Sequence, residues 1–131
     1  MNAAAARRFW GAAALLWCAL IFFLSSQSNP PVPGLFDKIP FSDKIAHAAL
    51  YAVLATLARF ALRDEKEGAP WLRAWLIAVA FAALYGASDE FHQRFVVNRT
   101  PDIIDWLADV SGASMAAVAF RVSRARRAAR K

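Results

Sequence analysis

One stretch of the chain decides the fold class: residues 71–88 read WLRAWLIAVAFAALYGAS. It is almost wholly apolar, it is rich in alanine and leucine, and it contains no proline. A membrane-spanning helix needs about 20 mostly apolar residues, with a range of about 17–25. Because only helices and closed barrels satisfy the backbone's hydrogen bonds in lipid, this composition predicts a transmembrane helix.

Three further apolar stretches, at residues 9–24, 45–62 and 103–122, flank this one. The first is short, but residues 3–6 extend it past Arg7 and Arg8, whose long side chains can reach back to the headgroups. We therefore expect an all-α membrane protein that is a single domain over residues 1–131. It is a four-helix transmembrane bundle, with helices at about 5–24, 43–62, 71–93 and 102–122 and a basic tail at 121–131. The rival interpretation of the first stretch is a cleaved signal peptide with residues 26–28 as its exit.

The composition excludes several other classes of protein. Hydrophobic residues make up 59% of the 131 residues, above the roughly 45–50% of soluble domains. A disordered chain is excluded because apolar surface is abundant. The single cysteine, Cys18, excludes an internal disulfide framework and a cysteine-based zinc site.

Lysine and arginine are unevenly distributed along the chain. Twelve of the 16 lie near the termini or around the second connection, and four lie in or beside the first and third connections. This bias predicts that both termini are cytoplasmic in a multi-pass protein of the bacterial inner membrane. We expect Trp10, Trp71 and Trp75 near the inner interface and Trp106 near the outer one. The basic tail then anchors the protein on anionic membrane lipids, and no nucleic-acid partner is expected because no nucleic-acid-binding module accompanies it.

The acidic residues follow the opposite pattern. Seven of the ten fall on the predicted outer side: Asp37, Asp43, Asp89, Glu90, Asp102, Asp105 and Asp109. The predicted topology therefore brings three segments, residues 43–47, 89–93 and 99–109, to one side of the membrane.

Spacing indicates which way the acids of the fourth helix point. Asp102, Asp105, Asp109, Gly112 and Ala116 recur at intervals of three and four residues, which places them on one helix face. Small residues let helices approach closely, and an ionised aspartate facing lipid costs about 2.5–3.5 kcal/mol. We therefore expect this stripe to face the bundle. His47, one turn inside the second helix, also needs a partner.

The predicted site combines two kinds of residue. The candidates for proton transfer or metal binding are Glu90, Asp89, Asp105 and His47. Lys44 and Arg99 are predicted to bind a phosphate or carboxylate, and the remaining ligand-binding candidates are Asp43, Gln93, Asp102 and Asp109. No cofactor is evident. Carboxylates with a histidine allow a divalent metal, but no HExxH or CxxC motif specifies one.

The same residues also have a structural interpretation. Asp43 and Asp102 lie in predicted first turns, where the helix dipole favours acids. The whole set could form an ion-pair network that only fixes helix packing. Asp89 and Glu90 fit this interpretation less well, because they lie near a helix carboxyl end, where the dipole opposes negative charge.

Three motifs carry a resemblance to a known family. They are DKIAH at residues 43–47, SDEFHQ at 88–93 and RTPDIID at 99–105. In this order, between membrane segments, they resemble the VanZ-like family of small bacterial membrane proteins over about residues 9–120. The founding member is associated with low-level resistance to the glycopeptide teicoplanin. The resemblance implies a role in the cell envelope without naming a reaction.

Three functions are consistent with these observations. The first is binding or modification of an anionic lipid or glycan precursor of the envelope at the outer site. The second is a structural or docking role, with a membrane partner or a second copy of the chain. The third is a small proton-coupled transporter that uses Asp109 and His47 as a relay. The relay is disfavoured because the inner halves of the helices lack an acid.

Overall fold

The computed structural model describes residues 2–28, 41–62 and 71–130. Over these residues it consists of four α-helices without any strand: α1 (Ala3–Ser25), α2 (Ser42–Ala61), α3 (Trp71–Gln93) and α4 (Ile103–Ala128). All four are long and apolar enough to cross a membrane, so the predicted fold class is confirmed. Asp37 and the second connection, at residues 63–70, lie outside the described residues.

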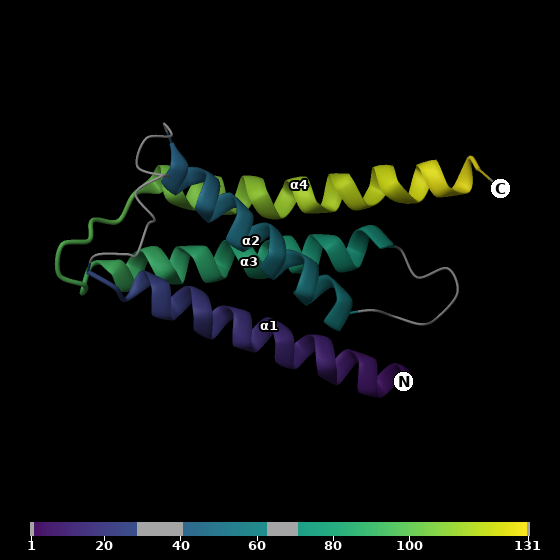
Figure 1. The fold of residues 1–131 in the computed structure, drawn as a ribbon, viewed down its shortest axis with the longest axis horizontal. Helices are drawn as coiled ribbons and strands as arrows, with labels where there is room; N and C mark the ends of the chain where they lie inside the picture. The colour runs from purple at the N-terminus through teal and green to yellow at the C-terminus, as the bar shows by residue number, and fades with distance from the viewer. Residues whose placement is uncertain (1, 29–40, 63–70, 131) are drawn as a thin grey trace.

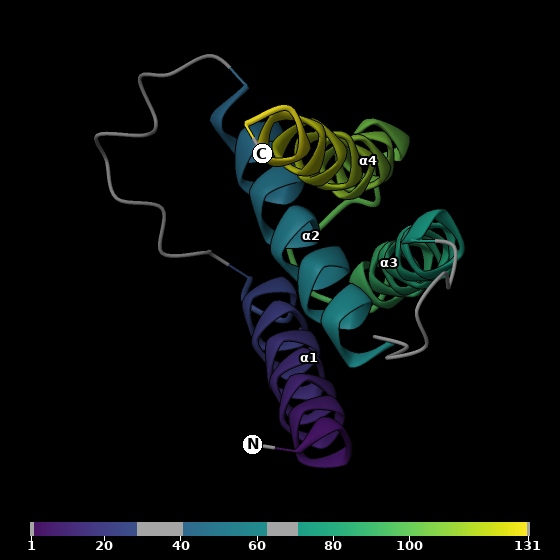
Figure 2. The ribbon, with the colours of Figure 1, turned by 90° about the vertical axis from the view of Figure 1, so that its right-hand side faces the viewer.

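The helices form a bundle in which α2 is the central element. It crosses the other helices obliquely and contacts all three, whereas α1 and α3 touch only slightly (Figures 1 and 2). Both termini lie at the same end of the bundle (Figure 1). The carboxyl ends of α1 and α3 and the amino ends of α2 and α4 therefore share the opposite end, and the polar motifs lie on these helix ends.

Small residues allow the helices to pack closely. Ala55, Ala78, Ala82 and Ala113 are fully buried. The closest approach is at Gly112, where an added Cβ would lie 2.0 Å from the backbone oxygen of Ala48. No side chain fits there, so glycine is what lets α4 touch the backbone of α2.

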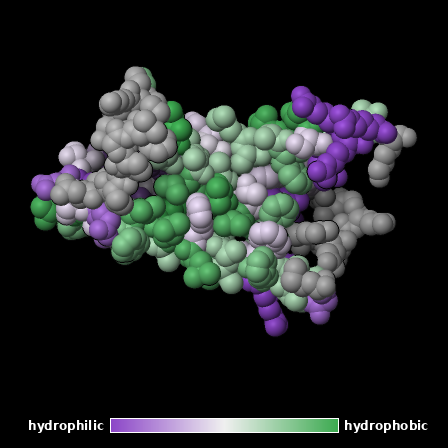
Figure 3. Space-filling view, in the orientation of Figure 1, coloured by the Kyte–Doolittle hydropathy of each residue, from purple (hydrophilic) through white to green (hydrophobic). Residues whose placement is uncertain are grey.

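Large apolar side chains lie mainly on the outside of the bundle. Leu15, Leu16 and Leu84 are each at least 70% exposed, and apolar residues cover most of the middle of the visible face (Figure 3). Hydrophilic residues gather at its two ends. This surface suits a bundle surrounded by lipid.

Two features differ from the sequence-based expectations. Trp75 is only 2% exposed and packs in the core against Phe120, at 5.5 Å between ring centroids, so it is not an interfacial belt residue. The helix α4 continues to Ala128, so most of the segment predicted as a basic tail is helical.

Candidate functional site

The polar residues predicted from the sequence gather at the end of the bundle opposite the termini. Lys44 and His47 lie in the first turns of α2, Glu90 and Gln93 close α3, and Asp105 opens α4. The connection after α3 leads to Asp102, whose carboxylate accepts a hydrogen bond from the Ile104 backbone N–H at 2.8 Å and caps α4. Aspartate is well suited to this position because its oxygen satisfies a free N–H of the first turn.

Lys44 is the centre of an ion-pair network between α2 and α4, which we call the lysine network. Its Nζ lies 3.0 Å from Asp43 Oδ2 and 2.8 Å from Asp102 Oδ2, and it also donates to Asp105 Oδ1. An ammonium group has three N–H donors, so these three carboxylates use all of them. Lys44 therefore has no donor left for a phosphate or carboxylate ligand while this network is intact.

His47 lies deeper and is held by a fully buried acid. Its Nδ1 and Asp109 Oδ1 share a hydrogen bond of 2.9 Å, and the Asp109 side chain has no exposed surface. On the other side of the ring, Nε2 lies 3.9 Å from Asp105 Oδ2. The prediction that α4 turns its acidic stripe inward thus agrees with the position of Asp109.

Glu90 is bound by the backbone that follows its own helix. Its Oε2 accepts a hydrogen bond from the Asp102 N–H at 2.8 Å, and its Oε1 accepts one from Gln93 Nε2 at 3.3 Å. Asp89 lies beside Gln93 and the Ser25 hydroxyl, and it is 5% exposed. Both acids are buried at the carboxyl end of α3, and neither forms a salt bridge with another described residue.

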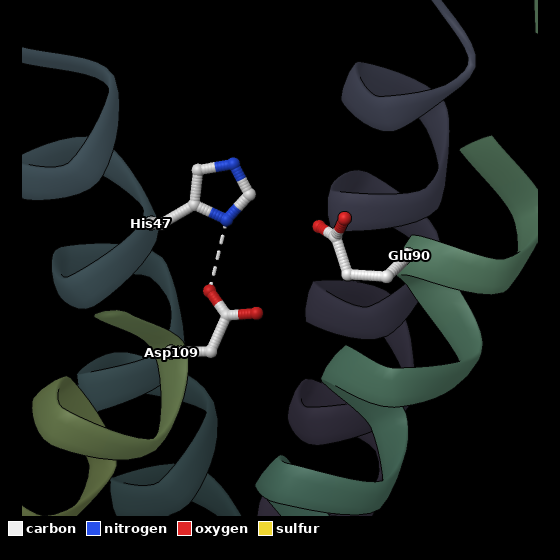
Figure 4. Close-up of side chains that lie close together, drawn as sticks. All are labelled: His47, Glu90 and Asp109. Atoms are coloured by element: carbon white, nitrogen blue, oxygen red, sulfur yellow. Dashed lines mark hydrogen bonds and ion pairs between the residues drawn. The ribbon is translucent and has the colours of Figure 1, made fainter. Parts of the chain in front are cut away.

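His47, Glu90 and Asp109 converge on one point from three different helices (Figure 4). One ligand atom from each can be chosen so that all three lie within 4.8 Å of one another. We call these three residues the buried triad. Two of its members are buried and His47 is half-buried. His47 and Asp109 lie about one helical turn deeper than Lys44 and Asp105, whereas Glu90 lies level with Asp102.

Two predicted ligand-binding residues lie apart from the triad. Arg99 donates from Nε to the backbone oxygen of Gln27 at 3.0 Å and from Nη2 to that of Leu24 at 3.3 Å. These bonds tie the connection after α3 to the carboxyl end of α1. Asp43, with a side chain 63% exposed, touches the site only through Lys44.

Sequence reasoning missed several residues that shape the site. An added Cβ on Gly86 would lie 2.8 Å from Asp109 Oδ2 and 3.3 Å from the Tyr51 ring. Gly86 therefore makes the room that the buried carboxylate occupies. His92 contacts Ser26 Oγ at 3.1 Å and packs against the Phe22 ring, with 4.5 Å between the ring centroids. Glycine inside an apolar helix was the available signal, because it is costly there unless packing requires it.

The electrostatics of the rim follow from the lysine network. The Lys44 ammonium and the Ile104 N–H hold the pKa of the Asp102 carboxyl below its usual range. Both interactions favour the charged form of the acid. Asp102 is thus an ionised acid that ties the start of α4 to α2.

The triad has the components of acid–base chemistry. A carboxylate on one ring nitrogen orients an imidazole and raises its basicity, which leaves the other nitrogen to exchange a proton with a substrate. Glu90 supplies a second carboxyl on the facing helix. The described residues at this end therefore provide groups that can donate and accept protons.

Comparison with known proteins agrees with the motifs. No curated protein and no solved structure matches the chain. A family model described as VanZ/LLP1 matches residues 10–124, which include all four helices of the bundle almost in full and every residue of the site. The chain therefore belongs to the VanZ/LLP1 family.

Proposed function

We propose that this protein binds and modifies an anionic lipid or glycan precursor of the bacterial cell envelope at the polar end of its bundle. The observation that carries the proposal is the convergence of His47, Glu90 and Asp109 from three helices of a membrane protein (Figure 4). Ionisable residues within membrane segments are costly and usually functional. Membership of the VanZ family supports a role in the envelope.

The depth of the triad supports a lipid-linked substrate. Helix α3 has 23 residues, which is about 35 Å of helix, slightly more than the hydrocarbon thickness of a typical bilayer of about 30 Å. Glu90 in its last turn is then at the level of the headgroups. Asp109 lies about two turns inside α4. A site at this depth suits the bond between a polar headgroup and its lipid.

The sidedness of the site supports an envelope substrate. The termini, at the opposite end of the bundle, carry most of the arginines, and α4 ends in a basic segment. The positive-inside rule assigns such ends to the cytoplasm. The triad then faces the outer side of the membrane, where a substrate from the cell envelope can reach it.

Native mass spectrometry of the protein released from gentle detergent tests the proposal. Wild type is compared with Glu90→Gln and Asp109→Asn, which change two members of the buried triad. Asp43→Asn serves as the matched control because that side chain is 63% exposed. We expect a bound lipid or glycan-lipid mass on wild type and on the control, and its loss from the two site variants. A bare wild type, or a mass that all variants retain, contradicts the proposal.

A growth assay extends the test to the cell. Expression of the wild-type gene in a teicoplanin-sensitive strain is compared with expression of Glu90→Gln at an equal protein level. Reduced sensitivity to teicoplanin that depends on Glu90 would link the site to the phenotype associated with the family's founding member. Equal sensitivity would separate this chain from that phenotype.

One observation favours a second, structural role for part of the cluster. Lys44 is fully engaged by Asp43, Asp102 and Asp105, as expected of a network that fixes helix packing. The test is a triple variant in which Lys44 is replaced by an apolar residue and Asp102 and Asp105 are replaced by asparagine. If the lysine network serves only helix packing, this variant keeps the bound mass. If the network also contacts substrate, that variant folds but loses the mass.

A further inference from the structure

We propose that His47, Glu90 and Asp109 together bind one divalent transition-metal cation, and that this cation, rather than Lys44 or Arg99, receives the phosphate of the headgroup. The metal site stands on the geometry alone. Only its role toward a phosphate rests on the proposed function.

The distances within the buried triad fit one ion. His47 Nδ1 and Asp109 Oδ1 are hydrogen-bonded at 2.9 Å, and two ligands about 2.1 Å from one tetrahedral ion lie about 3.4 Å apart, so an ion that replaces the shared proton needs these two atoms to separate by about 0.5 Å. All three ligand atoms lie within 4.8 Å, whereas ligands on opposite sides of such an ion are at most about 4.4 Å apart. A small inward movement of the Glu90 carboxylate therefore completes the site.

An unsatisfied oxygen indicates that the triad lacks a partner. Asp109 has no exposed surface, yet within the described part of the chain its Oδ2 has no hydrogen-bond partner. A buried carboxylate oxygen without a partner is expensive. Gly86 leaves room beside this oxygen, and Glu90 faces it from α3 (Figure 4). A cation among these groups removes the penalty.

The charge balance of the site points the same way. Six carboxyl groups line this end of the bundle: Asp43, Asp89, Glu90, Asp102, Asp105 and Asp109. Lys44 is saturated by three of them, and Arg99 is bonded to the end of α1. An anionic headgroup entering this site meets excess negative charge. A divalent cation reverses the sign where the phosphate must bind.

The donor set selects the class of metal. One imidazole nitrogen with two carboxylate oxygens suits Zn²⁺ and its first-row neighbours, whereas Ca²⁺ and Mg²⁺ prefer oxygen ligands alone. Three protein ligands leave a coordination position open, as in catalytic rather than structural zinc sites. That position is where a phosphate oxygen or a water binds.

Zinc titration of the purified full-length protein tests the site. The protein is stripped with chelator in detergent and titrated with Zn²⁺ alone, and bound metal is counted by elemental analysis. We expect one equivalent on wild type, and an affinity weakened about tenfold or more in Glu90→Gln and Asp109→Asn. His92→Gln is the matched control, because it removes the chain's other histidine, which contacts Ser26 outside the triad.

Visible spectra of the cobalt-loaded protein report on the metal's ligands directly, in addition to the amount of metal bound. Co²⁺ bound by nitrogen and oxygen gives visible absorption bands, which we expect from wild type and His92→Gln and not from His47→Gln. Glu90→Asp keeps the carboxylate on a side chain that is one methylene shorter, so the absorption bands of its bound Co²⁺ should shift. Absence of one zinc equivalent from wild type, or unchanged zinc and cobalt binding in the triad variants, overturns the proposal.

A lipid titration separates the metal site from the proposed function. Nanodiscs containing phosphatidic acid are compared with nanodiscs containing the same amount of uncharged diacylglycerol, with and without Zn²⁺. If phosphatidic acid binds in the presence of Zn²⁺, and diacylglycerol does not, the result supports the proposed role of the metal toward a phosphate. Zinc binding without any effect of phosphatidic acid leaves the metal site standing and overturns its role toward a phosphate.

Discussion

The lysine network and the buried triad lie next to each other, but they differ in how well their polar groups are satisfied. In the lysine network each donor of Lys44 has a carboxylate, and the groups are partly exposed, with side-chain exposures of 20% for Lys44 and 37% for Asp102. In the buried triad Asp109 is fully buried, and one of its oxygens has no partner among residues 2–28, 41–62 and 71–130. Both regions contain aspartates, but those of the lysine network share a cation, whereas Asp109 of the buried triad is paired only with His47 among the described residues.

This difference in hydrogen bonding indicates which of the acids have a structural role. A satisfied network at the rim ties α2 to α4 and needs nothing further. A buried polar group without a partner calls for an explanation, such as a functional role or a bound water or ion. The predictions below separate these roles, beginning with the substitution that should destroy both regions.

The largest effect is expected from Gly112→Leu. A side chain at this position collides with the Ala48 backbone, since even a Cβ would lie 2.0 Å from its oxygen. Backbone cannot move aside as a flexible side chain can, so we expect a loss of at least about 3 kcal/mol in the free energy of unfolding. The lysine network and the buried triad should both be disrupted, because both depend on the contact between α2 and α4. Thermal unfolding in detergent measures the loss of stability.

Gly11→Ala is the control for this substitution. An added Cβ there meets nothing within 4 Å, and alanine is the better helix former by about 1 kcal/mol. We expect unchanged or slightly raised stability. Equal damage from the two substitutions would argue against the close approach of α2 and α4.

Lys44→Met should damage the rim and spare the triad. It leaves the Asp102 and Asp105 carboxylates near each other without a cation, and for partly exposed groups we expect a loss of about 1–2 kcal/mol. Adding Asp105→Asn to Lys44→Met should recover part of the stability, as a double-mutant cycle measures. Loss of zinc binding in a folded Lys44→Met protein would contradict the separation of the two regions.

Arg99→Gln tests whether this residue holds ligand or structure. Its loss removes two hydrogen bonds to the end of α1, which at about 0.5–1.5 kcal/mol each is a modest cost. We expect a lower unfolding temperature with the same bound mass in native mass spectrometry. Loss of the bound mass at unchanged stability would return Arg99 to the ligand-binding residues.

The smallest effect is expected from Asp102→Asn, and it should depend on pH. The folded-state pKa of Asp102 lies below its usual value because of Lys44 and the Ile104 N–H. The stabilisation is therefore fully present above the unfolded pKa of about 3.9, and it is lost as the pH falls from there through the folded pKa. Asparagine keeps the cap without the charge, so unfolding of the variant should change less with pH in this acid range. An identical acid profile for both proteins would show that the ion pair contributes nothing.

The sequence predicted much of the fold because lipid imposes a simple rule. Four long apolar stretches must be helices, and residues at intervals of three and four must share a face. This reasoning placed Asp109 and Gly112 on the inner face of α4 and brought the three motifs to one end. It was wrong for Trp75, because the sequence does not show whether a tryptophan near a helix end faces the lipid or the core. That depends on the rotation of the helix about its axis.

Sequence reasoning was less successful with individual partners. Lys44 and Arg99 were both predicted to hold an anion, since both are cations beside an acidic cluster. Their actual partners, three carboxylates for Lys44 and two backbone oxygens of α1 for Arg99, depend on helix rotation and on the path of the connection after α3. No local pattern encodes either of these.

By itself, then, the sequence determined the number of helices, their membrane character and which end of the bundle is acidic. These follow from hydropathy and charge, which act on each segment separately. Only the tertiary structure decided that Lys44 pairs with Asp43, Asp102 and Asp105. It also decided that Asp109 lies beside His47 and Glu90 instead. That division depends on how closely α2, α3 and α4 approach at Gly86 and Gly112, and a hydrogen bond forms or fails over less than an ångström.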